Sequence, residues 1–142
     1  MMEIIDAISV RLNEVFGEDY TIYLEQVEQG LQTPCFFIQP IESTDKNMIS
    51  IRKYRTNTFV ITFIPSGTGS QREQLVQVAN RLLDHFDSFD LGNGVVLPTF
   101  DRSIDVADGT LNFILAFKYY KYKNGNSDDM QESLDMSVMN NG

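Results

Sequence analysis

The dipeptide Asp108-Gly109 lies inside the stretch 95–122, VVLPTFDRSIDVADGTLNFILAFKYYKY. Because both residue types tolerate positive φ angles, the dipeptide favours a tight type I′ turn and hence a β-hairpin. With these two residues as the loop, the directly opposed apolar pairs are Val106–Leu111, Ile104–Phe113 and Phe100–Phe117. Opposed residues share a face, so the pairs stack on one side, and Arg102, opposite Leu115, is the single misfit. A slip of one residue would scatter this pattern, which therefore predicts the register.

Two helices are predicted from apolar residues spaced three and four apart. The first, residues 2–16, ends before Gly17, and its apolar stripe consists of Ile4, Ile5, Ile8, Leu12, Val15 and Phe16. The second begins at Ser70, which forms an S-x-x-E capping box with Glu73, and runs to about residue 87. Its apolar stripe consists of Leu75, Val78, Ala79, Leu82 and Phe86. Each helix is therefore expected to bury one face.

Three strands are predicted before the second helix. Residues 20–30 alternate between apolar and polar side chains, and residues 35–41 form a short strand bracketed by Pro34 and Pro40. Residues 49–65 form a long strand whose first half is basic and whose second half is apolar on both faces. With the hairpin, the element order is α-β-β-β-α-β-β. This order predicts an α+β fold with a mostly antiparallel five-stranded sheet and two packed helices.

Length and charge narrow the class of protein. A chain of 142 residues fits one domain, predicted over residues 1–123, with an acidic, solvated tail over residues 124–142. The net charge of −9 argues against a protein built to hold phosphate backbones. No apolar run approaches the roughly 18 residues that span a bilayer, and the N-terminal stretch lacks the features of a signal peptide. Since a single cysteine forms no internal disulfide, we expect a soluble protein made in a reducing cytoplasm.

Cys35, the only cysteine, precedes Phe36, Phe37 and Ile38 in a predicted strand. A nucleophilic thiol needs a neighbouring base, a cation or a helix N-terminus to lower its pKa, and the adjacent sequence offers none of these. Cys35 is therefore expected to be a packing residue. His85, the only histidine, is expected at the surface at the end of the second helix. We accordingly predict no catalytic residue, no cofactor and no zinc site, and hence no enzyme.

The loops SGTGS (66–70) and GNG (92–94) fit neither common phosphate-loop pattern. The first precedes the second helix and is expected to be a flexible loop and helix cap. DRSID (101–105) and SDD (127–129) carry carboxylates without the spacing of a calcium-binding loop. No metal site is predicted from these segments.

Two segments, RKYR (52–55) and KYYKYK (118–123), interleave basic and aromatic residues. Such a pattern can stack against single-stranded nucleic acid. It also suits contacts between proteins, because Arg and Tyr are enriched at interfaces. In an acidic protein that meets further copies of itself, a basic patch finds complementary charge, so the interface interpretation is favoured.

The chain resembles a known family in the order and spacing of several segments. These are IIDAISVRLNEVFGEDYTIY (4–23), VEQGLQTPCFFIQ (27–39), RKYRTNTFVITFIP (52–65), EQLVQVANRLLDHF (73–86) and VADGTLNFILAFKYYKY (106–122). In them the chain is similar to the phage tail terminator proteins of long-tailed bacteriophages and prophages, also called tail completion or minor tail proteins. The resemblance covers residues 1 to about 123 and leaves out the acidic tail. None of the shared segments carries a catalytic motif.

The resemblance implies a structural virion protein of the tail or neck, synthesised in the bacterial host cytoplasm. It implies an antiparallel sheet flanked by helices and a ring, usually hexameric, at the head-proximal end of the tail tube. Such a ring stops the addition of tube protein and joins a head-completion or stopper protein, while DNA passes through the lumen without specific binding. The contact between copies is expected to join unlike patches. Its candidate residues are Arg52, Lys53 and Arg55 with the polar loop 43–50, and the SGTGS loop is expected to order on docking.

Three other functions remain open from the sequence. A head–tail connector, stopper or neck protein would share the fold and composition but would co-purify with DNA-filled heads. A small nucleic-acid-binding or regulatory module would use the Arg, Lys and Tyr segments and bind DNA with a strong salt dependence. A thiol enzyme would depend on Cys35 and would lose its function in a Cys35→Ser variant.

Overall fold

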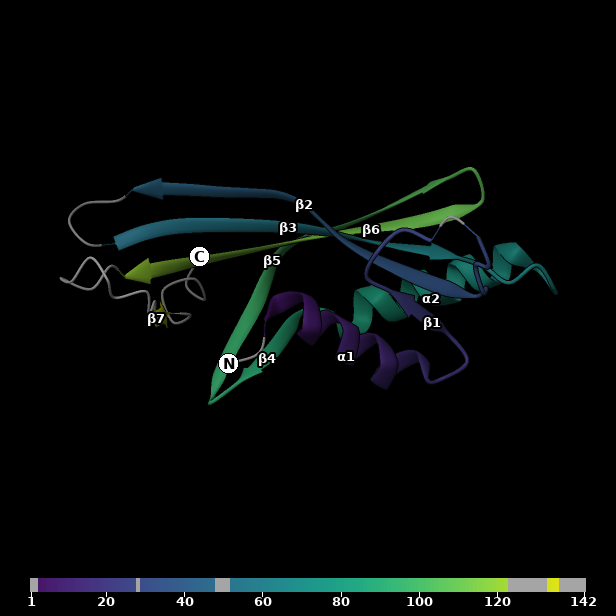
Figure 1. The fold of residues 1–142 in the computed structure, drawn as a ribbon, viewed down its shortest axis with the longest axis horizontal. Helices are drawn as coiled ribbons and strands as arrows, with labels where there is room; N and C mark the ends of the chain where they lie inside the picture. The colour runs from purple at the N-terminus through teal and green to yellow at the C-terminus, as the bar shows by residue number, and fades with distance from the viewer. Residues whose placement is uncertain (1–2, 28, 48–51, 123–132, 136–142) are drawn as a thin grey trace.

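The structure, a computed structural model, describes residues 3–27, 29–47, 52–122 and 133–135. Two helices, α1 (Ile4–Phe16) and α2 (Gln71–His85), pack on one side of a curved sheet (Figure 1). The strands are β1 (Thr21–Tyr23), β2 (Cys35–Asn47), β3 (Arg52–Ile64), β4 (Ser88–Gly92), β5 (Val95–Ala107), β6 (Thr110–Tyr122) and β7 (Ser133–Asp135). Their order across the sheet is β1-β2-β3-β6-β5-β4, with β7 paired to β6. The predicted α+β class with two packed helices is confirmed.

The predicted count of five strands is wrong, because two short strands escaped prediction. β4 has five residues, and the turn that joins it to β5 places Asn93 and Gly94 at φ angles of 55° and 77°. The GNG loop is therefore part of a second tight hairpin. β7 comes from the segment predicted as a solvated tail, and it pairs with residues 120–122 of β6. The remainder of that tail lies outside the described residues.

The first strand is shorter than predicted and makes the sheet mixed. β1 keeps three residues of the predicted strand 20–30, and it runs parallel to β2, with Thr21 opposite Cys35. Residues 24–27 and 29–34 are not strand, and the Gln32 backbone N–H donates a hydrogen bond of 3.0 Å back to the Tyr23 hydroxyl. A parallel neighbour requires a return connection, so the alternating pattern could not continue as strand.

The hairpin of β5 and β6 confirms the predicted turn and most of its register. Asp108 and Gly109 have φ angles of 54° and 76°, as a type I′ turn requires. The opposed pairs include Val106–Leu111, Ile104–Phe113 and Arg102–Leu115, as predicted. The predicted pair of Phe100 with Phe117 is wrong, since a bulge between Thr99 and Asp101 inserts Phe100 and places Thr99 opposite Phe117.

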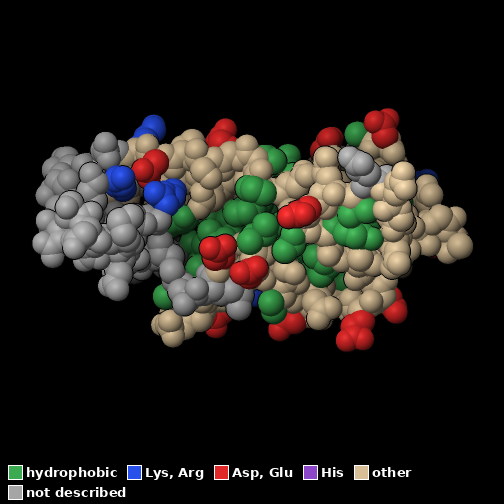
Figure 2. Space-filling view, viewed as in Figure 1, with side chains coloured by type: hydrophobic (Ala, Val, Ile, Leu, Met, Phe, Trp, Pro, Cys, Tyr) green, Lys and Arg blue, Asp and Glu red, His purple; other side chains and the backbone are tan. Residues whose placement is uncertain are grey.

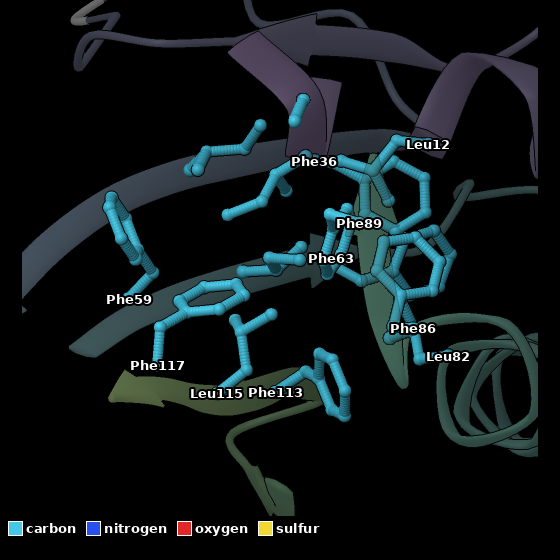
Figure 3. Packing of buried hydrophobic residues seen from close by; sticks show 14 of the residues in the cluster. Leu12, Phe36, Phe59, Phe63, Leu82, Phe86, Phe89, Phe113, Leu115 and Phe117 are labelled. Atoms are coloured by element: carbon cyan, nitrogen blue, oxygen red, sulfur yellow. The ribbon is translucent and has the colours of Figure 1, made fainter. Parts of the chain in front are cut away.

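The core lies between the helices and the odd-numbered residues of β3 and β6. Its largest fully buried side chains are Phe36, Phe63, Phe86, Phe89, Phe113, Phe117, Ile8, Leu12, Ile38, Ile61, Leu82 and Leu91. Figure 3 shows their rings converging from β2, β3, β6, β4 and the end of α2. Both predicted helical stripes reach this cluster, through Ile8 and Leu12 on α1 and through Val78 and Leu82 on α2. Burial of this apolar surface is the main stabilising term of the fold.

Side chains from two neighbouring elements hold the C-terminal end of α2. Arg11 of α1 donates to the His85 carbonyl, and Arg102 Nη1 of β5 donates to the Leu83 carbonyl at 2.8 Å. The last carbonyls of a helix lack partners within it, and cations suit the negative end of its dipole. This contact explains why Arg102 interrupts the row of apolar residues on one face of the hairpin: its side chain reaches across to cap α2.

Three strands project beyond the helices. We call residues 42–47, 52–58 and 118–122, from β2, β3 and β6, the arm, and the rest of the fold the body (Figure 1). Bulges lie where the arm leaves the body, between Pro40 and Glu42 in β2 and between Thr99 and Asp101 in β5. At its bulge β5 turns away from β6 and, with β4, folds beneath the core (Figure 1). The arm thus contains residues 43–47 of the segment 43–50 that was predicted to be a polar loop.

Candidate subunit interface

The predicted contact residues lie on β3 within the arm. Lys53 and Arg55, two residues apart, point to the same face, and both contact Asp45 on β2. Lys53 Nζ lies 3.4 Å from Asp45 Oδ2, and Arg55 Nε lies 3.2 Å from Asp45 Oδ1. All three side chains are partly exposed. Arg52 begins β3, and its side chain lies outside the part that the structure describes.

Asp45 only partly neutralises this cluster. Its slight loss of hydration alone would raise its pKa, but the hydrogen bonds and charges of Arg55 and then of Lys53 outweigh that effect and lower the pKa. The carboxylate therefore stays ionised at neutral pH, where one negative charge faces two cations. Exposed ion pairs of this kind contribute little to stability. Their effect is to hold Lys53 and Arg55 side by side on one face of the arm.

Pairing of β3 with β6 brings the two basic and aromatic segments together. Lys53 lies opposite Lys121, and Arg55 lies opposite Tyr119, whose hydroxyl accepts from the Asn57 amide. The sequence contained both RKYR and KYYKYK, yet their proximity depends on a pairing of strands far apart in the chain. Two further lysines lie on the other face of the arm: Lys46, which belongs to the predicted contact loop 43–50 and is exposed on β2, and Lys118, whose Nζ lies 4.5 Å from the Phe100 ring centre.

Arm and body carry opposite charge. The arm residues 42–47, 52–58 and 118–122 hold six of the eleven Lys and Arg residues of the chain and two acids, Glu42 and Asp45, and β7, which pairs with β6 in the arm, adds Asp135. Residues 1–41 and 56–117 hold four arginines and fourteen acids. In Figure 2 most of the visible basic side chains lie near one end, with an acidic side chain among them, and the other acidic side chains spread over the rest of the visible face. The subunit is therefore bipolar, a property that the net charge of −9 conceals.

The SGTGS loop is bonded to α2 within a single chain. The Gln74 side chain accepts from the Ser66 backbone N–H at 2.8 Å and donates to the carbonyls of Ser66 and Thr68, each at 3.2 Å. Ser70 Oγ accepts from the Glu73 backbone N–H at 3.3 Å, which is one half of the predicted capping box. These bonds fix the loop without any partner, in contrast to the flexible loop expected from its composition.

The cysteine and the histidine occupy unlike environments. Cys35 has no exposed surface, and burial raises the pKa of its thiol, which confirms it as a packing residue. His85 is exposed at the end of α2, as predicted. Among the described residues, no hydrogen bond joins the two side chains, and no group of three His, Cys, Asp or Glu could hold a metal ion. None of the described helices is long and apolar enough to cross a membrane.

Burial of Cys35 gives a direct prediction for thiol labelling. We expect a maleimide to modify the folded chain at least about a thousandfold more slowly than the unfolded chain, because labelling requires an opening of the core. Mass spectrometry of the adduct over time, with and without denaturant, measures the ratio. Equal rates in the two conditions would show that the thiol is accessible and would reopen the question of its reactivity.

A projecting basic arm beside an acidic body is an arrangement that suits contacts with other proteins. The phage tail terminator protein family matches residues 3–135, so the chain belongs to this family. The match extends past residue 123, where the sequence resemblance ended, and includes β7. A search of curated proteins finds no significant match. The chain is thus a structural protein of the phage tail, and its place is in the virion.

Proposed function

We propose that copies of this chain form a ring at the head-proximal end of the tail tube, where the ring stops the addition of tube subunits and offers the surface that joins the head. The family match over residues 3–135 carries this proposal. The bipolar subunit supports it, because opposite charges on two parts of one chain favour contacts between unlike patches. Such contacts close into a ring when the rotation between neighbours closes. A hexamer is the expected ring.

The proposed contact between copies includes Arg52, Lys53 and Arg55. In the adjoining loop 43–50, residues 43–47 belong to β2 of the arm, and residues 48–50 lie outside the described residues. The proposed partners are further copies, the tube protein and a head-completion protein. The acidic body suits a ring through which DNA passes, because carboxylates repel phosphates and prevent adhesion.

Deletion of the gene from the phage or prophage that encodes it tests the function. Without a terminator, we expect headless tails of excessive and variable length, because nothing stops the tube. Electron micrographs give the length distribution, and the wild-type chain supplied from a plasmid should restore uniform tails. Tails of normal length that only fail to join heads would overturn the terminator assignment and would identify a connector or stopper.

The interface assignment is tested in the same assay. An arm variant with Arg52→Glu, Lys53→Glu and Arg55→Glu is expected to leave tails overlong, because its arm repels an acidic neighbour. Arg72→Glu, at an exposed position in the first turn of α2, serves as the control and should restore normal length. If the arm variant also restores normal length, these three residues do not belong to the subunit contact.

A further inference from the structure

A groove of about 390 Å³ runs between α1 and β4 on the body. Ala7 and Phe89, both buried, form its floor, and Val10 stands at its side with 47% of its surface exposed. Glu14 of α1 and Asp90 of β4 complete the walls. An exposed apolar side chain above a buried floor, flanked by carboxylates, is the composition of a docking surface with an apolar centre and a charged rim.

The charge of this groove is negative because its lining holds two carboxylates, Glu14 and Asp90, and one arginine, Arg11. Arg11 donates to the His85 carbonyl, and its guanidinium lies 4.8 Å from the centre of the Phe89 ring. Its Nε lies 3.8 Å from Glu14, whose side chain nevertheless remains 66% exposed. Asp6 is exposed one helical turn before Val10 and extends the acidic rim along α1.

The basic arm of the same chain cannot reach the groove and pair with its acidic side chains. β2, β3 and β6 are paired continuously from the core to the arm, with Ile61 opposite Phe113 and Lys53 opposite Lys121 along one ladder. A bend that returned the arm to α1 would break this ladder. The arm instead points away from α1 and β4 (Figure 1). The complementary partner must therefore be another molecule.

We propose that the groove between α1 and β4 receives the basic arm of a second copy of this chain. The charge complementarity of the two surfaces argues for this occupant: Lys53 and Arg55, which share one face of the arm, meet Asp6, Glu14 and Asp90 around the groove. Each copy carries one arm and one groove, so the contact joins unlike patches and propagates from copy to copy. The inference rests on the proposed function only in that both require copies to meet.

Reversal of the groove charges tests the contact. The groove variant carries Asp6→Lys and Glu14→Lys, and the control carries Glu73→Lys and Asp105→Lys, two acids at exposed positions outside the groove. Sedimentation velocity measures self-association in about 50 mM salt, where charge interactions are weakly screened. We expect the wild type and the control to associate, with affinity falling as salt rises. The groove variant and the arm variant, each alone, should associate at least about tenfold more weakly.

An equimolar mixture of the groove variant and the arm variant provides the decisive measurement. Each wild-type arm then finds a wild-type groove, and each reversed arm finds a reversed groove, so we expect association to return. This recovery also shows that both variants are folded. A mixture that stays monomeric, a groove variant that associates like the wild type, or a wild type monomeric at about 1 mM would overturn the inference. None of these outcomes affects the tail-length assay, which tests the terminator function separately.

Discussion

Replacement of Phe113 by alanine is expected to lower the free energy of unfolding by about 3–5 kcal/mol. Phe113 lies on β6 between Ile61 of β3 and Ile104 of β5, and none of its surface is exposed. Its ring meets Phe86 edge to face, with 6.0 Å between the ring centres (Figure 3). Truncation removes these contacts and leaves a cavity between the sheet and the end of α2, which close packing cannot readily fill.

Urea denaturation followed by circular dichroism measures this loss as a shift in midpoint at constant slope. Phe100→Ala is the matched control, since the same side chain is removed from a site that is 51% exposed. We expect this control to cost less than about 1 kcal/mol, including its contact with Lys118. Equal losses in the two variants would contradict the placement of Phe100 outside the core.

The second large effect is expected at Arg102. Substitution by methionine keeps most of the aliphatic stem but removes the donor to the Leu83 carbonyl, and it should cost about 1–2 kcal/mol. The carbonyl lies in the last turn of α2, where no further helical N–H can replace the guanidinium. Thermal unfolding and hydrogen exchange at the end of α2 measure the effect.

Arg72→Met, in the exposed first turn of the same helix, should change stability by no more than about 0.5 kcal/mol. If Arg102→Met were equally neutral, the bond to Leu83 would not contribute to stability. Arg102 would then be only a charged residue that the apolar face of the β5–β6 hairpin tolerates.

Local patterns predicted much of the fold. The turn at Asp108-Gly109 and the pairs up to Arg102 depend on residues close in sequence, so turn geometry and alternation sufficed. The pairing failed at Phe100, because a bulge depends on how β5 bends beneath the core and leaves no local mark in the sequence. β4 was missed for a similar reason: five residues between a helix and a turn show too little periodicity.

The candidate interface was predicted only in part. Arg52, Lys53 and Arg55 were identified from composition, and the structure adds Asp45 as their partner and Lys121 as a neighbour across β6. These neighbours depend on pairing between strands distant in sequence. The groove was inaccessible to sequence reasoning, because one of its walls is β4. The family resemblance identified the kind of protein without locating either surface.

The bulges at the junction of arm and body have a geometric consequence. Because β3 and β6 pass from the core into the arm without a break in their pairing, the direction of the arm is set by the twist of the sheet. The inserted residue between Pro40 and Glu42 increases that twist locally. If the arm seats in the next copy, this angle fixes the rotation from one subunit to the next. The circumference of the ring would then be determined inside each monomer, before any two copies meet.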